Sequence, residues 1–364
     1  MLLMIMMCSL TKIRNRPKSL CKVVLCLTTV SLALLFVISA FLRTPIATLS
    51  IFTSNGTQTN GMAYHVKKQA NATACSEGMF ISPNGCLPCP NGTFSFPGWT
   101  ECKPFLNCSE IASQVHSRRR ILGGFTKQIW LADWKDHEVV YLKCLRPGVT
   151  KRCLRGMTIL EKLQSPFVTR LIGKCYENFE IVTMYYKHGS TKTVGRLLQK
   201  PEFSHFNNIQ TRFQLLVDYV KIMSYMHNSS IGVRVLCDSA TIGKLLSQYL
   251  ITDDFHLVVN DLDNAPDARQ VEGIVCNHKF ARESNSWFAP EQRGLSESDS
   301  DEKVEIWKIP VIAQRLLGDV DGSSFVKSKL EGVMTRCQAM NPQQRPTANE
   351  VVQELLRVQE LTII

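Results

Sequence analysis

The stretch from residue 235 to residue 263 constrains the fold more than any other part of this chain. It carries two aspartates, Asp238 and Asp261, and each of them ends a short apolar run. Between them, residues 249–251 and 255–259 have the β-branched, aromatic and apolar composition of strands, and a short polar turn separates them. The pattern therefore predicts a loop with one acid, then a hairpin, then a second acid.

Two acids arranged in this order suit phosphoryl transfer. One carboxylate accepts the proton of the attacking hydroxyl, and the other holds a metal ion against the phosphates. Protein kinases place their base and their metal ligand on either side of such a hairpin. Either aspartate alone is explained more simply as an ordinary turn residue, so the assignment depends on the rest of the chain.

The N-terminal part of the chain contains an uncharged apolar run over residues 23–42. This run is long enough to cross a bilayer as a helix. Five lysines and arginines lie between residues 12 and 22, whereas only Arg43 follows closely. The positive-inside rule then predicts a cytoplasmic tail over residues 1–22, a signal anchor over 23–42 and a lumenal remainder. A cleaved signal peptide is the alternative, although the run is longer than a usual signal core.

Cysteines and glycosylation sequons support a secretory compartment. Of the fourteen cysteines, three lie before or inside the apolar run, which leaves eleven (14 − 3) on its lumenal side. Five Asn-X-Ser/Thr sequons lie there too. A lumenal location excludes nucleic acid as a partner. The formal charge of +11 is then better explained by attraction to an anionic nucleotide or glycan.

The region after the apolar run divides into a stem and a cysteine-rich segment. Residues 43–74 are rich in Thr, Asn, Ser and Gly and are predicted to form a flexible, glycosylated stem. Residues 75–110 contain five cysteines, for which disulfides are the simplest explanation, and the run 86–102 within them resembles a repeat of receptor cysteine-rich modules. A zinc site is less suited, because no histidine accompanies the cysteines. Since five is odd, one thiol pairs elsewhere or stays free.

Residues 111–360 have the pattern of a globular domain, with predicted strands first and helices after them. Residues 121–131 have the pattern of a strand, a glycine turn and a second strand, which is the shape of a loop that covers nucleotide phosphates. Gly124 keeps the second glycine of such a loop, and Lys127 stands in the place of the third. The match is weak taken alone, because Leu122 replaces the first glycine.

The usual phosphate-binding lysine of the next strand is missing, because Leu142 holds its position. Lys143 follows directly, and the alternation of side chains along a strand places it on the opposite face. The glutamate that normally pairs with this lysine is missing as well. Gly156 stands at its place on a helix predicted over residues 151–163. Lysine and glutamate are therefore lost together, which is a consistent departure.

Later features predict a helical lobe. Residues 212–227 form an amphipathic helix with one apolar stripe. Residues 289–291 (Ala-Pro-Glu) stand where an activation segment ends, and residues 341–347 resemble the closing motif of the fold. We predict a buried, structural ion pair between Arg345 and Glu291. The chain as a whole predicts an α+β, two-lobed, protein-kinase-like fold, preceded by a transmembrane helix and a small cysteine-rich segment.

Several short motifs carry a closer resemblance through their order and spacing. They are Cys237-Asp-Ser239, Leu246-Ser-Gln-Tyr-Leu250, Asn260-Asp-Leu-Asp263, Phe288-Ala-Pro-Glu-Gln292 and Ile306-Trp-Lys-Ile-Pro310. From about residue 102 to near its C-terminus, the chain resembles the protein O-mannose kinases. The resemblance implies an ATP-dependent kinase anchored in the endoplasmic reticulum membrane as a single-pass type II protein. It implies phosphorylation of the 6-hydroxyl of an O-linked mannose, within a GalNAc–GlcNAc–mannose core on an α-dystroglycan-like glycoprotein.

The resemblance also assigns roles to individual residues. Asp238 becomes the base for the mannose hydroxyl. Asp261 becomes a ligand of Mg²⁺ or Mn²⁺, and Gln248 takes the place of the usual second metal ligand after an insertion in the loop. Gly124 and Lys127 become nucleotide-binding residues, with Lys127 supplying the missing phosphate lysine. A solvated strand lysine is the simpler alternative for Lys127.

Three other interpretations remain open from the sequence. The missing lysine and glutamate favour a catalytically inactive pseudokinase that acts as a lumenal glycan-binding or scaffold protein, whereas the two retained aspartates speak against it. A lumenal kinase for proteins or other sugars is a second possibility. The third is an adhesion-type receptor that uses its cysteine-rich segment.

Overall fold

The structure is a computed structural model of the chain. It describes residues 75–123, 127–145, 147–270, 276, 287–294 and 301–362. The predicted tail, signal anchor and stem, residues 1–22, 23–42 and 43–74, lie outside these ranges. Within them, no helix is both long enough and apolar enough to cross a membrane.

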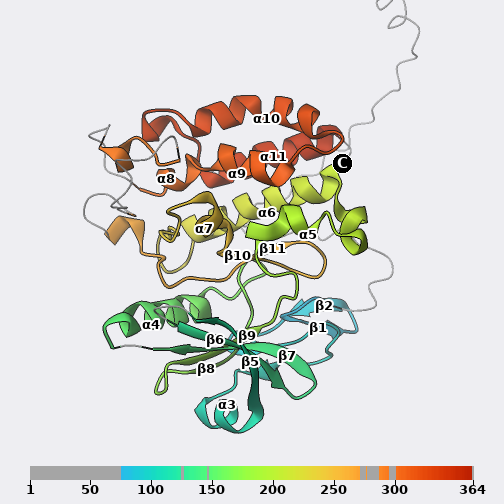
Figure 1. Cartoon of the computed structure of the whole chain (residues 1–364), viewed down its shortest axis with the longest axis vertical. Helices are drawn as coiled ribbons and strands as arrows, with labels where there is room; N and C mark the ends of the chain where they lie inside the picture. Colours follow the sequence, from blue (N-terminus) through green and yellow to red (C-terminus); the bar gives the residue numbers. More distant parts are fainter. Residues whose placement is uncertain are drawn as a thin grey trace, which may run out of the picture. The chain divides into compact units, whose positions relative to one another are not determined.

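A five-stranded antiparallel sheet with the strand order β5-β6-β7-β9-β8 forms the first lobe. The strands are β5 (Val115–Gly123), β6 (Lys127–Trp134), β7 (His137–Cys144), β8 (Leu171–Cys175) and β9 (Glu180–Met184). Helix α4 (Pro147–Lys162) follows β7 and lies beside the sheet (Figure 1). Strands β6 and β7 are joined by a turn of two residues, 135 and 136, which fixes their register.

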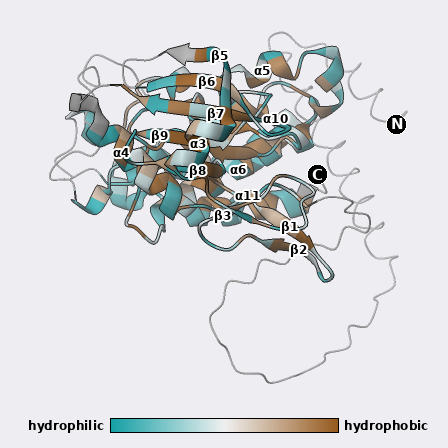
Figure 2. Ribbon diagram, turned by 90° about the horizontal axis from the view of Figure 1, so that it is seen from below, coloured by the Kyte–Doolittle hydropathy of each residue, from teal (hydrophilic) through white to brown (hydrophobic). Residues whose placement is uncertain are grey.

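Alternating burial along the strands decides which side chains face the core. In β7, Val139, Leu142 and Cys144 are buried, whereas Lys143 between the last two is exposed. Figure 2 shows both hydrophobic and hydrophilic residues along the strands of this sheet. Leu142 and Cys144 lie two positions apart and pack into the main hydrophobic core, whereas Val139 lies on the opposite face, in a second hydrophobic cluster that includes Trp134. Lys143 accordingly turns to the face away from Leu142, as its position in the sequence predicts.

The cysteine-rich segment packs onto the sheet of the first lobe. It contains two small hairpins, β1 (Met79–Ser82) with β2 (Gly85–Pro88), and β3 (Thr93–Phe94) with β4 (Lys103–Pro104). Disulfides Cys75–Cys86 and Cys89–Cys102 close them. The Phe94 ring lies edge-on to Trp134 of β6, with centroids 5.4 Å apart, and both side chains are 1% exposed. The segment therefore shares its hydrophobic core with the sheet.

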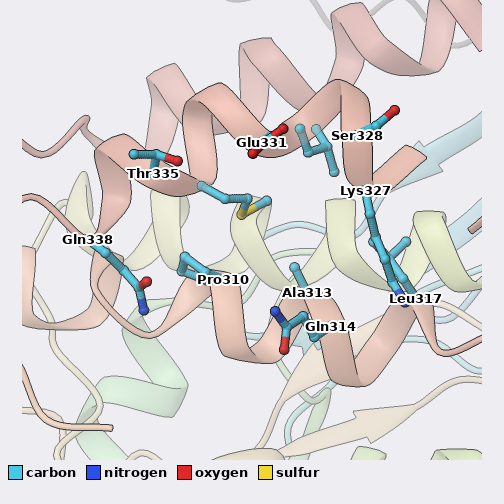
Figure 3. A pocket seen from close by; sticks show the side chains of 11 residues that line it. Pro310, Ala313, Gln314, Leu317, Lys327, Ser328, Glu331, Thr335 and Gln338 are labelled. Carbon is cyan, nitrogen blue, oxygen red and sulfur yellow. The ribbon is translucent and has the colours of Figure 1, made fainter. Parts of the chain in front are cut away.

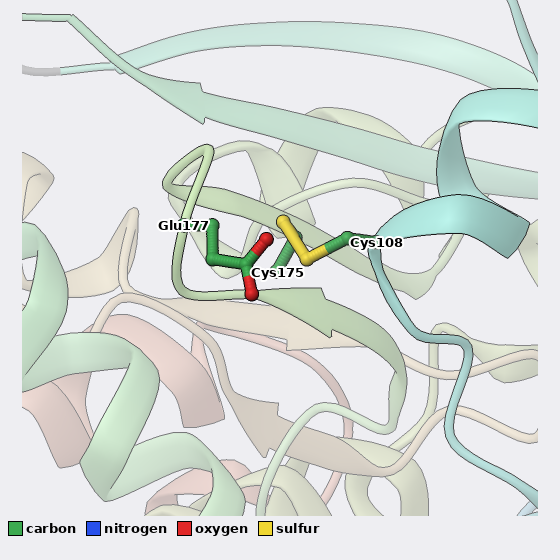
Figure 4. Close-up of side chains that lie close together, drawn as sticks. All are labelled: Cys108, Cys175 and Glu177. Carbon is green, nitrogen blue, oxygen red and sulfur yellow. A yellow bond between two sulfur atoms is a disulfide. The ribbon is translucent and has the colours of Figure 1, made fainter.

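The fifth cysteine of this segment, Cys108, pairs with Cys175 at the end of β8. Cys108 begins helix α3 (Cys108–Gln114), so the disulfide joins this helix to the sheet (Figure 4). Glu177 lies beside the two sulfurs. Because both thiols are oxidised, the three residues do not form a metal site. Cys108 is therefore the cysteine that pairs outside its segment, which is one of the two alternatives that the sequence left open.

Helices form the second lobe around the long helix α6 (Ile209–His227) (Figure 1). The others are α5 (Val194–Leu197), α7 (Ile242–Leu246), α8 (Lys303–Ile306), α9 (Ile309–Leu317), α10 (Ser323–Cys337) and α11 (Ala348–Thr362). Asn208 caps α6 by accepting a hydrogen bond from the backbone N–H of Thr211. The predicted apolar stripe of α6 is buried in the lobe's core.

Strands β10 (Tyr249–Ile251) and β11 (Leu257–Val259) form the hairpin that the sequence predicts after Asp238. The second strand begins two residues later than predicted. Phe255 has a left-handed backbone with φ of 60°, which no strand residue adopts, so it belongs to the turn. The hairpin places Asp238 before its first strand and Asp261 directly after its second.

The predicted ion pair between Arg345 and Glu291 is present in the second lobe. Arg345 Nη1 lies 2.6 Å from Glu291 Oε1, and Nη2 lies 2.9 Å from Oε2. Both side chains are fully buried. A bidentate, buried arginine–carboxylate pair of this kind ties the end of the segment 287–294 to the closing motif.

Candidate active site

One cavity of about 370 Å³ brings together residues from both lobes. Lys127, Asp238 and Asp261, three of the residues predicted from the sequence, all line it. Its apolar part comes from β6, β7, β9 and α4 of the first lobe, and its polar part includes the loop after β11. The cavity therefore combines an apolar wall with several charged groups, which is the usual composition of a small-molecule site.

Another cavity, of about 400 Å³, lies between α9 and α10 in the second lobe (Figure 3). Side chains from the two facing helices, among them Pro310, Leu317 and Glu331, line it. It shares no residue with the first cavity and holds none of the residues predicted from the sequence. Chemistry rather than size therefore identifies the first cavity as the candidate active site.

Lys127 occupies the centre of the charged group. Its Nζ lies 3.0 Å from Asp261 Oδ1 and 2.9 Å from Asp263 Oδ1. Lys127 is the first residue of β6, and the two aspartates follow β11, so the pairs bridge the two lobes. The side chain is only 12% exposed, which is far less than a solvated strand lysine would be.

Burial and charge set the protonation of these three groups. Burial alone would lower the pKa of Lys127, but the two carboxylates outweigh it and raise that pKa, so the ammonium form persists at neutral pH. Burial raises the pKa of Asp261, but the charge and hydrogen bond of Lys127 more than reverse this and lower it. For Asp263, burial outweighs the attraction of Lys127 and raises the pKa to about 6.

Gly156 of α4 explains how Asp263 reaches Lys127. A Cβ atom added to Gly156 would collide with Asp263 Oδ1, so the carboxylate occupies the room that the missing side chain leaves. Gly156 stands where the family pattern has a glutamate that pairs with a lysine. Here Asp263 supplies the carboxylate and Lys127 the ammonium. Sequence reasoning found Lys127 but missed Asp263, because the signal was an absent side chain in a distant helix.

Asp238 forms an ion pair with Lys244, with 2.6 Å between Asp238 Oδ2 and Lys244 Nζ. Both side chains are partly exposed and both line the cavity. Lys244 lies on α7, within the insertion that separates Asp238 from the hairpin. This lysine was also missed, since the insertion shifts it away from the spacing at which kinases carry a lysine after their base.

The backbone around Asp238 is fastened by its neighbours. Leu236 N–H donates to Glu305 Oε1 at 3.1 Å, and Cys237 forms a disulfide with Cys276. Glu305 lies on α8, and its side chain is long enough to reach the loop. The carboxylate of Glu305 and the disulfide therefore support the loop on the N-terminal side of Asp238.

Gln248 lies close to the cavity but is not part of its lining. It is buried, and its Nε2 donates to Lys244 O at 2.9 Å. Its Oε1 has no hydrogen-bond partner among the residues that the structure describes. A buried amide oxygen without a hydrogen-bond partner lowers the stability of the fold unless another group binds it. The structure thus brings Lys127, Asp238 and Asp261 together in one cavity, whereas Gln248 is not part of its lining and Gly124 lies outside the described residues.

A β-sheet lobe, a helical lobe and a cavity with a lysine and two loop aspartates between them define a protein-kinase-like phosphotransferase. Curated relatives narrow this class. The chain is 36% identical to protein O-mannose kinase of Gallus gallus over 287 residues, which cover 76% of this chain and 81% of the relative. The chain belongs to the protein O-mannose kinase family.

Two further relatives agree. Protein O-mannose kinase of Homo sapiens is 34% identical over 300 residues, which cover 78% of this chain and 85% of the relative. The corresponding protein of Xenopus laevis is 35% identical over 280 residues, which cover 74% and 80% of the two chains. No protein-family model matches the chain.

Proposed function

We propose that this protein transfers the γ-phosphoryl group of ATP to the 6-hydroxyl of an O-linked mannose. The acceptor is the mannose of a GalNAc–GlcNAc–mannose core on an α-dystroglycan-like glycoprotein. The observation that carries the proposal is the meeting of Asp238, Asp261 and Lys127 in one cavity, in a chain that belongs to the protein O-mannose kinase family. An inactive scaffold would have no use for all three groups there.

Asp238 is the group that accepts the proton of the mannose hydroxyl. Its carboxylate lines the cavity and is partly exposed, so an acceptor can reach it. The ion pair with Lys244 balances its charge and holds its side chain in one orientation. Glu305 holds the backbone at Leu236, which fixes the carboxylate's position in the loop.

The donor set fits a hard divalent cation such as Mg²⁺ or Mn²⁺. The lowered pKa of Asp261 keeps its carboxylate charged, and the unpaired Oε1 of Gln248 is an amide oxygen in need of a partner. Asp261 and Gln248 would hold the ion, and Asp263 offers a further carboxylate beside them. When bound, the ion supplies positive charge to the phosphate oxygens.

Lys127 provides the positively charged side chain that binds the phosphates of the nucleotide. Its ammonium lies in the cavity, and Leu142 at the usual lysine position contributes only an apolar side chain there. Lys143 contacts Glu180 instead, with Nζ 3.1 Å from Oε1. Lys127 therefore takes the place of the strand lysine, and Gly124 of the same turn is proposed to bring its backbone amide to the nucleotide.

Covalent chemistry supports the proposed secretory compartment. Ten of the eleven cysteines after residue 42 form five disulfides, and Cys337 is buried and free. Five disulfides suit an oxidising lumen. The sequon asparagines Asn91, Asn107 and Asn228 are exposed, as glycosylation requires. We propose a single-pass type II protein of the endoplasmic reticulum membrane, anchored by residues 23–42.

The test of this function uses the purified full chain, ATP with Mg²⁺ or Mn²⁺, and two synthetic trisaccharides. One is GalNAc–GlcNAc–mannose, and the other is the same sugar with hydrogen in place of the mannose 6-hydroxyl. Mass spectrometry should find one added phosphate on the first and none on the second. Equal phosphorylation of both sugars, or of neither, would contradict the proposal.

A further inference from the structure

Lys308 is a lysine buried directly beneath the proposed catalytic loop. It lies between α8 and α9, and its side chain is 1% exposed. Lysine is among the residues that are almost never fully buried unless they are paired. The carboxylate of Glu305, three residues earlier, contacts His227 Nε2 at 2.8 Å. A lysine in such a place calls for a reason other than stability.

The ammonium group of Lys308 contacts the loop that carries Asp238 and two aromatic side chains beside it. Its Nζ donates to Ser239 Oγ at 2.7 Å, and Ser239 follows Asp238 directly in the chain. The ammonium also lies 5.3 Å from the ring centroid of Trp287 and 5.9 Å from that of Phe288. These two aromatic residues come directly before Ala-Pro-Glu, at the end of the segment that faces the acceptor in kinases.

Ser239 is held from two directions. Its hydroxyl accepts from Lys308, and its carbonyl accepts a hydrogen bond of 2.9 Å from Trp287 Nε1. Ser239 N–H in turn donates to Cys237 O at 2.8 Å, so Asp238 stands in the middle of a tight three-residue turn. Any movement of Ser239 would therefore turn the Asp238 carboxylate.

Glu305 and Lys308 act on opposite sides of the same turn. Glu305 binds Leu236 N–H, two residues before Asp238, and Lys308 binds Ser239, one residue after it. The two side chains come from one helical turn, since Lys308 N–H donates to Glu305 O. Glu305 and Lys308 thus hold the turn on both sides of Asp238.

We propose that Lys308 is a positioning residue for the transfer reaction. It sets the orientation of Asp238 through Ser239 and couples this turn to the acceptor-side aromatics Trp287 and Phe288. The inference rests on the proposed function of the cavity and deepens it. Lys308 does not line the cavity, so its effect should be confined to the base and the acceptor.

The alternative is that Lys308 merely stabilises the fold. Replacing a buried charge by an apolar side chain of similar volume is often neutral or stabilising. A Lys308→Met variant should therefore keep or raise its melting temperature while its catalysis falls, which the loss of a stabilising residue would not do. Ser239→Ala removes only the hydroxyl at the other end of the contact, and it keeps the test valid if the methionine variant does not fold.

The experiment measures kcat, the KM values for ATP and the trisaccharide acceptor, and the melting temperature. It compares the full wild-type chain with Lys308→Met, Ser239→Ala, the double variant and Lys327→Met. Lys327, on α10, contacts Gly318 and Asp319 and serves as the matched lysine control. Each single variant should lower kcat at least about tenfold, as small misplacements of catalytic groups do. The KM for ATP should not change, and the double variant should be no slower than the slower single variant.

Wild-type kcat in both single variants would overturn the role of Lys308, and so would losses that simply follow a lowered melting temperature. Additive losses in the double variant would also overturn it, because the two residues would then act separately. Absence of transfer by the wild-type chain would instead overturn the proposed function, and the inference with it. The wild-type assay therefore separates the two failures.

Discussion

Gly156 and Asp263 are complementary in space: the carboxylate of Asp263 fills the room that a side chain on Gly156 would need. Asp263 then lies 2.9 Å from Lys127, so a lysine–carboxylate pair is kept although both of the usual positions have lost their residues. The usual pair joins a strand lysine to a helix glutamate. Here the lysine has moved to the preceding strand and the carboxylate to the loop after β11. The apparent losses at Leu142 and Gly156 are one coordinated rearrangement.

A Gly156→Ala substitution tests this complementarity. Glycine to alanine in an exposed helix interior stabilises a protein by about 1 kcal/mol. In this place the added methyl group collides with Asp263 and displaces it, so we expect a loss of about 1–3 kcal/mol of unfolding free energy. Phosphate transfer should fall as well, because Lys127 loses one partner. Chemical denaturation and the transfer assay measure the two effects.

Gly332→Ala on α10 is the matched control. Nothing lies within 4 Å of a Cβ built on Gly332, and this glycine is also in a helix. The control should be stabilised or unchanged and fully active. If Gly156→Ala behaved like Gly332→Ala, the steric relationship between α4 and Asp263 would be wrong.

Lys127 and Lys143 offer a direct comparison between the cavity lysine on β6 and a lysine on the adjacent strand β7. Lys127→Ala should reduce kcat/KM for ATP by about a hundredfold, the scale on which a preorganised charge at a phosphate acts. Lys143→Ala removes only a half-exposed pair with Glu180 and should leave the rate near that of the wild type. Steady-state kinetics at varied ATP concentration measure both. A stronger effect from Lys143→Ala would show that the phosphate-binding lysine lies on β7 and that its assignment to Lys127 of β6 is wrong.

The disulfide between Cys237 and Cys276 fixes the residue directly before Asp238. Cys237 stands where kinases carry an arginine that binds activation-loop phosphate, so a covalent bond replaces a regulated contact. The paired substitution Cys237→Ser with Cys276→Ser should lower kcat and cost about 2–5 kcal/mol of stability. The same substitutions at Cys89 and Cys102 should cost stability but leave kcat of the folded protein unchanged. Equal kcat values in the two double variants would contradict the positioning role of the first disulfide.

Lys308 predicts how stability depends on pH. Burial lowers the pKa of Lys308, and the attraction of Glu305 opposes this effect only in part. The net pKa falls from 10.5 to about 8. Because the folded-state pKa lies below the unfolded one, the cost to stability is full below about pH 8 and vanishes above pH 10.5. The cost is on the order of 3 kcal/mol. Urea denaturation should show Lys308→Met more stable than the wild type at pH 7, with a difference that shrinks toward pH 10. A difference that does not change with pH would contradict the lowered pKa.

Much of this arrangement is readable from the sequence. Asp238 and Asp261 are predicted because they flank a hairpin with clear strand and turn residues, and Arg345 with Glu291 because both belong to recognisable motifs. Local patterns carry these signals. The helices predicted over residues 151–163 and 212–227 correspond to α4 and α6, although each begins a few residues earlier than predicted, and the left-handed Phe255 delays β11.

Other features depend on distant parts of the chain meeting in space. The pairing of Cys108 with Cys175 cannot be deduced from cysteine positions alone. Asp263 follows from the absence of a side chain at Gly156, and Lys244 is hidden by an insertion of variable length. Lysine is usually an exposed residue, so only the folded structure reveals that Lys308 is buried. A sequence pattern shows which residues the chain contains, whereas these features depend on which residues come into contact in the folded protein.

The central claim is that Asp238 and Asp261 of this chain carry a mannose kinase activity. The most direct measurement is mass spectrometry of the GalNAc–GlcNAc–mannose trisaccharide after incubation with ATP, Mn²⁺ or Mg²⁺ and the full chain, beside the Asp238→Asn and Asp261→Ala variants. The account predicts one added phosphate with the wild type and at least a roughly hundredfold loss with each folded variant. Transfer that survives both substitutions would contradict the assignment of the site. A folded wild-type chain that binds the trisaccharide but adds no phosphate would show a glycan-binding pseudokinase.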